Sequence, residues 1–192
     1  HQDLFVANAN FAAGQNNFLY HNNGNGTFTK ITTGNIVTDG GNSTGGSWGD
    51  YDNDGDLDLL VPNYSNSPNF LYRNDGGGNF TRVVGDPVVT DANSSVGSTW
   101  GDYDNDGDLD LFVANDNNQN NALYSNNGNG TFTKITTGDI VNDGGRSNGS
   151  AWGDYDNDGD IDLFVTNGDE PTVQSNFLYR NDGNSNKWAN IL

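Results

Sequence analysis

Aspartate dominates three copies of one nine-residue motif, Asp-Tyr-Asp-Asn-Asp-Gly-Asp-(Leu/Ile)-Asp, at positions 50–58, 102–110 and 154–162. In a loop of this kind the side chains at positions 1, 3 and 5 converge on one point, and glycine at position 6 permits the sharp turn. The carbonyl of residue 7 and the carboxylate of residue 9 complete an all-oxygen shell. Such a shell suits Ca²⁺, because Mg²⁺ requires a tighter octahedron that keeps more water. The motif therefore predicts three calcium sites per chain.

The motif leaves two questions open. The loops could be solvated turns, but five aspartates at fixed spacing in three copies favour a metal site. Two carboxylates about 4 Å apart repel by roughly 4 kcal/mol at an effective dielectric constant of 20, and a cation would remove that repulsion. The first half of the motif matches the calcium loop of EF-hands, whereas the second half lacks their Glu at position 12. We favour an ion with a purely structural role over one that contacts a ligand.

The elements that position these loops repeat with the same period of 52 residues. A tryptophan stands two residues ahead of each motif, at Trp48, Trp100 and Trp152. In the second full unit, β-prone segments between Gly- and Asn-rich turns predict strands at 98–100, 109–114, 121–125 and 131–136. No apolar stripe at helical spacing is present, so we predict no helix. Four short strands per period are typical of a propeller blade, which buries its faces against neighbouring blades.

The expected fold is all-β: a single β-propeller repeat domain over residues 1–192, with about four blades of four antiparallel strands. The predicted blade units are approximately 1–45, 46–97, 98–149 and 150–192. The first blade should be incomplete, because His1–Asn8 aligns with 108–115, past the Trp strand of its unit. We predict that Trp188–Leu192 forms the fourth strand of the last blade. The alternative is that this segment replaces the missing Trp strand of the first blade and closes a ring.

Composition excludes several classes of function. The formal net charge is −19, and 15 of the 26 acidic residues lie in the three motifs, so the acidity is mostly local. Seven Lys and Arg without a basic cluster argue against nucleic-acid binding and against anionic membranes. No stretch reaches the apolar length of a membrane span. Cysteine is absent, which excludes disulfides and thiolate metal sites. Methionine is also absent, so we expect a processed chain or a fragment.

The run Trp-Gly-Asp-Tyr-Asp-Asn-Asp-Gly-Asp-Leu-Asp-Leu-Phe-Val-Ala-Asn, followed by Asn-x-Leu-Tyr and Asn-Asn-Gly-Asn-Gly-Thr-Phe-Thr, resembles the VCBS or FG-GAP-like repeat. That family is similar to the β-propeller of integrin α subunits, and the resemblance covers essentially the whole chain. It implies calcium in the hairpin between the first two strands of each blade. The implied side-chain ligands are Asp50, Asp52, Asp54, Asp58, Asp102, Asp104, Asp106, Asp110, Asp154, Asp156, Asp158 and Asp162. The implied carbonyl ligands belong to Asp56, Asp108 and Asp160. Only Asp3 survives in the first unit, so we expect no fourth site unless another chain completes it.

The first functional expectation is a non-enzymatic, calcium-binding module, secreted or on the cell surface, that serves adhesion or assembly. A lectin-like propeller that holds a carbohydrate between blades is the alternative, and an accessory domain of a larger secreted enzyme is a third reading. We predict no catalytic residues, since His1 and His21 lack a partner motif. Trp48, Trp100 and Trp152 could form a platform on which sugars stack, but their fixed place in every unit favours packing in the core.

The ends of the repeat array predict partners. A first blade without its Trp strand would expose a strand edge and a blade face, which proteins normally cover. We therefore expect self-association through the terminal blades, as a closed ring or a filament, or contact with the rest of a longer chain. Glycans and an extracellular protein are further candidate partners.

Overall fold

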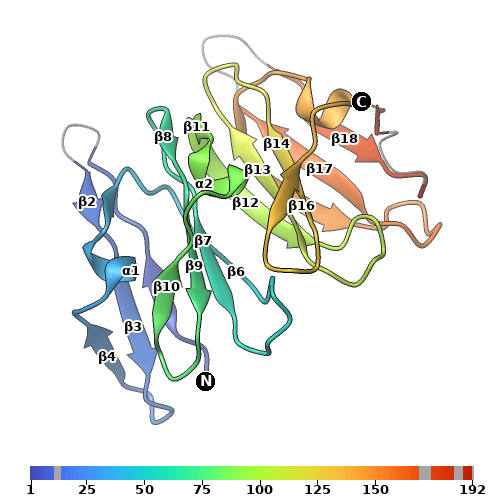
Figure 1. The fold of residues 1–192 in the computed structure, drawn as a ribbon. Helices are drawn as coiled ribbons and strands as arrows, with labels where there is room; N and C mark the ends of the chain where they lie inside the picture. Colours follow the sequence, from blue (N-terminus) through green and yellow to red (C-terminus); the bar gives the residue numbers. More distant parts are fainter. Residues whose placement is uncertain (11–13, 169–173, 184–187, 192) are drawn as a thin grey trace.

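The computed structural model describes residues 1–10, 14–168, 174–183 and 188–191, and within these ranges the chain is almost entirely β-structure. Figure 1 shows antiparallel sheets that follow one another from the N-terminus (blue) to the C-terminus (red). The predicted all-β class, with strands grouped into small antiparallel sheets, is confirmed.

The first sheet contains three strands within the described residues, in the order β1-β3-β4. They are β1 (Leu4–Val6), β3 (Phe18–Asn22) and β4 (Phe28–Ile31). The edge of β1 that a Trp strand would occupy therefore has no partner among the described residues, as the incomplete first unit predicts.

The second, third and fourth sheets each contain four antiparallel strands in chain order. The second sheet consists of β6 (Ser47–Gly49), β7 (Asp58–Val61), β9 (Phe70–Asn74) and β10 (Phe80–Arg82). The third consists of β12 (Ser95–Gly101), β13 (Asp110–Asn115), β14 (Ala122–Asn126) and β15 (Phe132–Lys134). The fourth consists of β16 (Ser147–Gly153), β17 (Asp162–Asn167), β18 (Phe177–Arg180) and β19 (Ala189–Asn190). In each of these sheets the acidic motif is the hairpin loop between the first two strands.

The C-terminal segment follows the first of its two predicted arrangements. In β19, Asn190 pairs with Tyr179 and Ala189 pairs with Arg180 of β18. The segment is thus the fourth strand of the last sheet and does not pair with β1; Leu192 itself lies outside the described residues. Two short ladders join consecutive sheets: β2 (Gln15–Asn16) with β5 (Gly40–Gly41), and β8 (Ser67–Pro68) with β11 (Ala92–Asn93).

The prediction that the chain has no helix is wrong for three short segments, each ahead of a Trp strand. They are α1 (Asn35–Thr38), α2 (Pro87–Thr90) and the 3₁₀ turn η1 (Asp139–Val141). One turn is too short to show a helical stripe, which is why periodicity missed them. Asp86 and Pro87 did carry a local signal, since Asp86 Oδ1 accepts a capping hydrogen bond from Val88 N at 3.0 Å. Within the described residues no helix has the length and apolarity needed to cross a membrane.

Apolar side chains pack between each pair of consecutive sheets. Between the first and second sheets the buried residues are Leu19, Ile36, Val37, Leu59, Val61, Phe70 and Tyr72. Between the second and third they are Tyr51, Leu60, Leu71, Val88, Val89, Leu111, Val113, Ala122, Tyr124 and Phe132. Between the third and fourth they are Tyr103, Phe112, Ala114, Leu123, Ile140, Val141, Leu163, Val165, Tyr179 and Trp188. Successive strand residues point to opposite faces, so Leu59 and Leu60 belong to different interfaces.

The repeated tryptophans pack in these interfaces, as the core reading predicts. Trp48, Trp100 and Trp152 each lie against a different one of the three apolar clusters. Trp100 Nε1 also donates a hydrogen bond to the Ser47 carbonyl of the preceding sheet, at 3.2 Å. A Trp strand therefore contacts the strand of the preceding unit as well as its own sheet.

Gly101 and Gly153, at the ends of two Trp strands, offer a matched pair of substitutions that test the packing between sheets. A Cβ at Gly101 would lie 2.7 Å from a ring carbon of Trp152 and 2.9 Å from Ile161 Cδ1, whereas a Cβ at Gly153 would have no described atom within 4 Å. We expect Gly101→Ala to lower the free energy of unfolding by about 1–3 kcal/mol, because it overpacks the interface. Gly153→Ala should be neutral or slightly stabilising. Urea denaturation measures both, and equal losses for the two variants would contradict this packing.

Candidate metal centres

The backbone of each acidic loop adopts conformations that its asparagine and glycine permit. The asparagines at position 4 have positive φ: 58° at Asn53, 60° at Asn105 and 61° at Asn157. The glycines at position 6 have φ values of 94° at Gly55, 95° at Gly107 and 99° at Gly159. Asparagine tolerates the left-handed region better than most residues with a Cβ. At the larger φ of position 6 a Cβ would be strained, so glycine is what lets the loop turn back on itself.

Three of the predicted ligands come together in every loop. One carboxylate oxygen from each of three residues, at positions 1, 3 and 9, lies within 4.8 Å of the other two. The three groups are Asp50, Asp52 and Asp58; Asp102, Asp104 and Asp110; and Asp154, Asp156 and Asp162. Such a cluster of carboxylates is the donor set that a hard divalent cation prefers, so the residues present fit Ca²⁺.

The aspartates at positions 5 and 7 are placed differently. The carboxylate of Asp54 accepts a hydrogen bond from Asp56 N at 2.9 Å, and Asp106 and Asp158 make the same contact at 2.9 and 3.0 Å. These side chains stand outside the three-residue groups. At position 7 two side chains form hydrogen bonds with the preceding acidic loop. Asp108 Oδ1 accepts a hydrogen bond from Asn53 Nδ2 at 2.6 Å, and Asp160 Oδ1 accepts one from Asn105 Nδ2 at 2.7 Å. Sequence reasoning missed this contact between consecutive loops.

The ninth aspartate anchors each loop to its sheet. Asp58, Asp110 and Asp162 are at most 1% exposed. Asp110 Oδ2 accepts from Tyr103 N at 3.0 Å, and Asp110 Oδ1 accepts from Asn126 N at 2.8 Å. The other two make the equivalent pairs of bonds. Each of these carboxylates therefore joins its loop to the last residue of the third strand or, in the fourth sheet, to the residue that follows it.

Burial raises the pKa of several carboxyl groups in the metal-free loops. Burial raises the pKa of Asp58 and of Asp110 to about 7. The backbone hydrogen bonds that these carboxylates accept act in the opposite direction, but burial has the larger effect. Burial and then the neighbouring Asp54 raise the pKa of Asp52, and burial and Asp106 do the same for Asp104. A divalent cation would reverse both effects, because it supplies the positive charge that these carboxylates lack.

The raised pKa values predict a pH dependence of stability in metal-free protein. Asp58 and Asp110 have folded-state pKa values of about 7 against a usual value of 3.8, so the folded chain holds their protons more tightly than the unfolded chain. Their contribution to stability is fully present below the unfolded pKa and is lost as pH rises through the folded pKa. We therefore expect a lower urea midpoint at pH 8 than at pH 5 in a chelator. The double variant Asp58→Asn, Asp110→Asn should flatten this slope, and a slope of opposite sign in the parent chain would refute the prediction.

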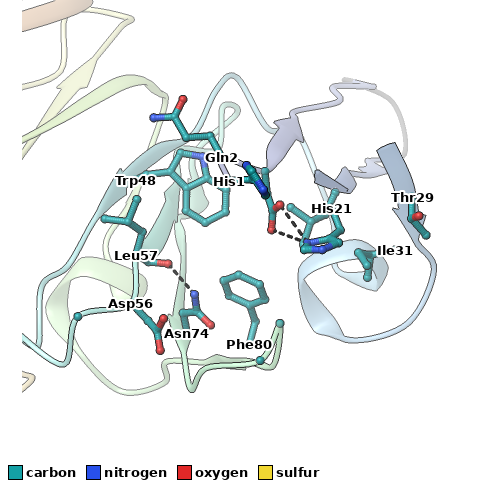
Figure 2. Close-up of a pocket in the computed structure, with 15 residues that line it drawn as sticks. His1, Gln2, His21, Thr29, Ile31, Trp48, Asp56, Leu57, Asn74 and Phe80 are labelled. Atoms are coloured by element: carbon teal, nitrogen blue, oxygen red, sulfur yellow. Dashed lines mark hydrogen bonds and ion pairs between the residues drawn. The ribbon is translucent and has the colours of Figure 1, made fainter. Parts of the chain in front are cut away.

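A cavity of about 930 Å³ lies between the first and second sheets. Figure 2 shows Trp48, Asn74 and Phe80 on one side of it and His21 and Ile31 on the other. His21 Nδ1 lies 3.1 Å from Asp3 Oδ1, at an exposed position. The missing Trp strand of the first unit was the sequence signal that could have pointed to this cavity.

Comparison with known proteins places the chain in a family. A family model described as the FG-GAP-like repeat matches residues 1–61, 63–113 and 102–165. The chain belongs to the FG-GAP-like repeat family. Each FG-GAP-like match ends three residues after an acidic motif, in the strand that the motif leads into. The resemblance noted in the sequence is thereby confirmed.

Similar proteins give the FG-GAP-like chain a wider context. Cartilage acidic protein 1 of Mus musculus is 28% identical over 200 residues, and that of Homo sapiens is 27% identical over 200 residues. The chain spans 30% of the length of these relatives, while 99% of the chain is matched. Among solved structures, a lectin of Agrocybe aegerita, studied for its specific recognition of non-reducing terminal N-acetylglucosamine, has a similar fold. It gives a TM-score of 0.57 at 17% identity, over 98% of this chain and 51% of the lectin chain.

Proposed function

We propose that this chain is a calcium-binding, non-enzymatic extracellular module whose sheets are blades of a β-propeller and which serves adhesion or assembly. The observation that carries the proposal is the carboxylate triad in each of the three loops. Extracellular calcium modules bind at about 10⁻⁴–10⁻³ M, a range that solvent-exposed loops of this kind suit. Relatives named for cartilage support an extracellular location.

The ion has a stabilising role in this proposal. In the first loop Asp50, Asp52, Asp54 and Asp58 would hold it together with the carbonyl of Asp56, and the equivalent aspartates would do so in the other two loops. Calcium supplies positive charge that neutralises the clustered carboxylates. The ninth aspartate connects the ion site to the sheet, because its carboxylate accepts hydrogen bonds from the backbone of the loop and of the third strand.

Isothermal titration of metal-free protein with calcium tests this proposal. We expect three ions per chain and about two for Asp104→Asn, because that change removes a triad carboxylate. Asp139→Asn is the matched control: it makes the same charge change at an exposed position outside the motifs, and it should leave three ions bound. Fewer than three ions in the parent chain, or equal losses in both variants, would count against it.

Assembly through the terminal sheets is part of the same proposal. The first sheet exposes Leu4, Phe18 and Phe28 by 36–50%, and the last part of the chain exposes Tyr155, Phe164 and Ile191 by 36–45%. Their counterparts at the same repeat positions in the inner sheets are buried or partly buried. A head-to-tail contact between copies would cover both faces. Sedimentation in calcium should then give a particle larger than one chain, and a monomer at micromolar concentration would exclude this contact.

A lectin-like function is the second candidate. The likeness to a lectin and the cavity beside Trp48 and Phe80 favour it, because aromatic rings suit the apolar faces of sugars. A titration with N-acetylglucosamine in calcium, followed by tryptophan fluorescence, tests it. A Trp48→Phe variant distinguishes binding in this cavity from binding elsewhere.

A further inference from the structure

Two asparagines, at or just past the end of the third strand of their sheets, reach the acidic loop of the preceding sheet. Asn126 Nδ2 donates a hydrogen bond to the Tyr51 carbonyl at 2.7 Å, and Asn181 Nδ2 donates one to the Tyr103 carbonyl at 2.7 Å. Both asparagines are at most 7% exposed. A hydrogen bond inside a protein is electrostatically stronger than one in water, so each of these bonds holds the backbone of the preceding loop in place.

Asn126 also contacts a residue of the carboxylate triad in its own sheet. Its backbone N–H donates to Asp110 Oδ1 at 2.8 Å. Tyr51, whose carbonyl accepts from the Asn126 side chain, lies in the chain between Asp50 and Asp52, which both belong to the triad of the first loop. One buried asparagine therefore connects the triads of the first and second loops. Equivalent bonds connect the second loop to the third.

A second, exposed bridge joins the same loops. It is the hydrogen bond from Asn53 Nδ2 to Asp108 Oδ1 at 2.6 Å, and the bond from Asn105 Nδ2 to Asp160 Oδ1 at 2.7 Å is its equivalent one repeat later. Asn53 stands between positions 3 and 5 of its motif, and the carbonyl of Asp108 is the ligand expected at position 7 of the next. Two separate contacts thus connect groups that would hold consecutive ions.

Charge by itself would make neighbouring sites oppose each other. Each motif contains five aspartates, so an ion in one loop makes the surroundings of the next loop less negative and weakens the attraction for a second cation. This effect acts between exposed charges and decays over a Debye length of about 8 Å at physiological salt and about 3 Å at 1 M. Positive coupling between the sites therefore cannot come from charge.

The hydrogen-bonded bridges act with the opposite sign. The carboxylates of an ion-free triad repel one another and favour a more open loop, whereas an ion favours the closed loop in which the bridging groups are in place. A loop that an ion holds closed then offers its bridging groups to the next loop. That neighbour needs less ordering to bind its own ion, and by linkage the effect is reciprocal.

We propose that the bridges through Asn126 and through Asn53 with Asp108, and their equivalents one repeat later, couple the calcium sites, so that an ion in one loop strengthens binding in the next. This inference rests on the proposed calcium-binding function. The three side chains are positioning groups, because they hold the loops and leave the triad carboxylates to bind the ion.

Calorimetric calcium titrations of the full chain measure the coupling. Asp154→Asn leaves a chain with the first two sites, and adding Asp102→Asn or Asp50→Asn leaves only the first or only the second site. For independent sites, the overall binding constant for two ions equals the product of the two single-site constants. We expect it to exceed that product by about two- to tenfold, the range that one or two net hydrogen bonds provide.

Removing the bridges tests their role, with single-site constants measured again in each background. Asn126→Ala with Asn53→Gly should reduce the excess to about one or below, and glycine keeps the positive φ of 58° at position 53 without strain. Two variants are matched controls and should keep the excess. Asn74→Ala removes the same bonds within its own sheet as Asn126→Ala does, and Asn105→Gly removes only a bond to the disabled third loop.

The possible outcomes separate this proposal from the calcium-binding function. An excess of about one in the parent two-site chain, with both ions bound, overturns the coupling alone, whereas single-site chains that bind no calcium overturn both proposals. An excess that survives the loss of both bridges, or that disappears in 1 M NaCl, also overturns the coupling through hydrogen bonds. If Asn126→Ala fails to fold, Asn53→Gly alone should still lower the excess by about twofold, and no change would contradict the proposal.

Discussion

Chelating calcium should lower the thermal midpoint of this protein by several degrees. If each of three sites binds at about 10⁻⁴–10⁻³ M, calcium at about 1 mM contributes roughly 0.4–1.4 kcal/mol per site by mass action. The three together contribute about 1–4 kcal/mol, which for a chain of this size corresponds to a shift of roughly 3–15 °C. The physical cause is the set of carboxylate oxygens within 4.8 Å of one another, which repel when no ion is present. Differential scanning calorimetry with and without chelator measures the shift.

The control for chelation is a chain that cannot bind the ion. Asp50→Asn, Asp102→Asn and Asp154→Asn together remove one carboxylate from every triad. This variant should have nearly the same thermal midpoint in calcium and in chelator. A parent chain whose midpoint does not respond to chelation would show that the loops are solvated turns.

The second prediction compares the loss of stability at one phenylalanine position that recurs in two sheets. Phe112 is 0% exposed in the interface between the third and fourth sheets, where it meets Trp152 edge to face with ring centroids 6.4 Å apart. Phe112→Ala should cost about 3–5 kcal/mol, because it removes a buried ring and leaves a cavity. Urea denaturation gives the loss directly.

Phe164 is the matched control, since it stands at the same repeat position in the fourth sheet and is 36% exposed. In dilute solution, where a head-to-tail contact between copies is dissociated, we expect Phe164→Ala to cost less than half as much as Phe112→Ala. Similar costs at the two sites would mean that another copy covers the last sheet in solution, and they would then depend on protein concentration.

The sequence predicted the repeated elements well, because each is encoded locally. The continuous apolar run after the motif, as in Leu111-Phe112-Val113, led directly to a central strand. Likewise, the glycine and aspartates of the loop led to the carboxylate triads. The open edge of β1 followed from counting back one repeat from Trp48.

Properties that depend on a neighbouring sheet could not be predicted in this way. Tyr51 and Tyr155 occupy the same motif position, yet Tyr51 is 3% exposed and Tyr155 is 45% exposed. The difference arises because a further sheet covers Tyr51. The raised pKa of Asp58 is caused by burial, which the motif alone does not report. The cavity beside Trp48 also depends on a neighbouring sheet, because residues of the first and second sheets line it together.

The tyrosine in the third strand of each complete sheet reaches back across one interface. Tyr72 donates a hydrogen bond to Asp39 at 3.1 Å, Tyr124 to Asp91 at 2.7 Å, and Tyr179 to Asp143 at 3.3 Å. The phenol and its acceptor thus lie in adjoining units at nearly constant separation along the chain. A gene duplication that inserts one whole period would reproduce this bond and the bond between acidic loops without creating a new kind of surface. Changes in loop length need not break it: three more residues separate Asp143 from Tyr179 than separate Asp91 from Tyr124, and the bond is kept. The number of sheets is therefore expected to change in whole periods, while the loops between strands vary in length.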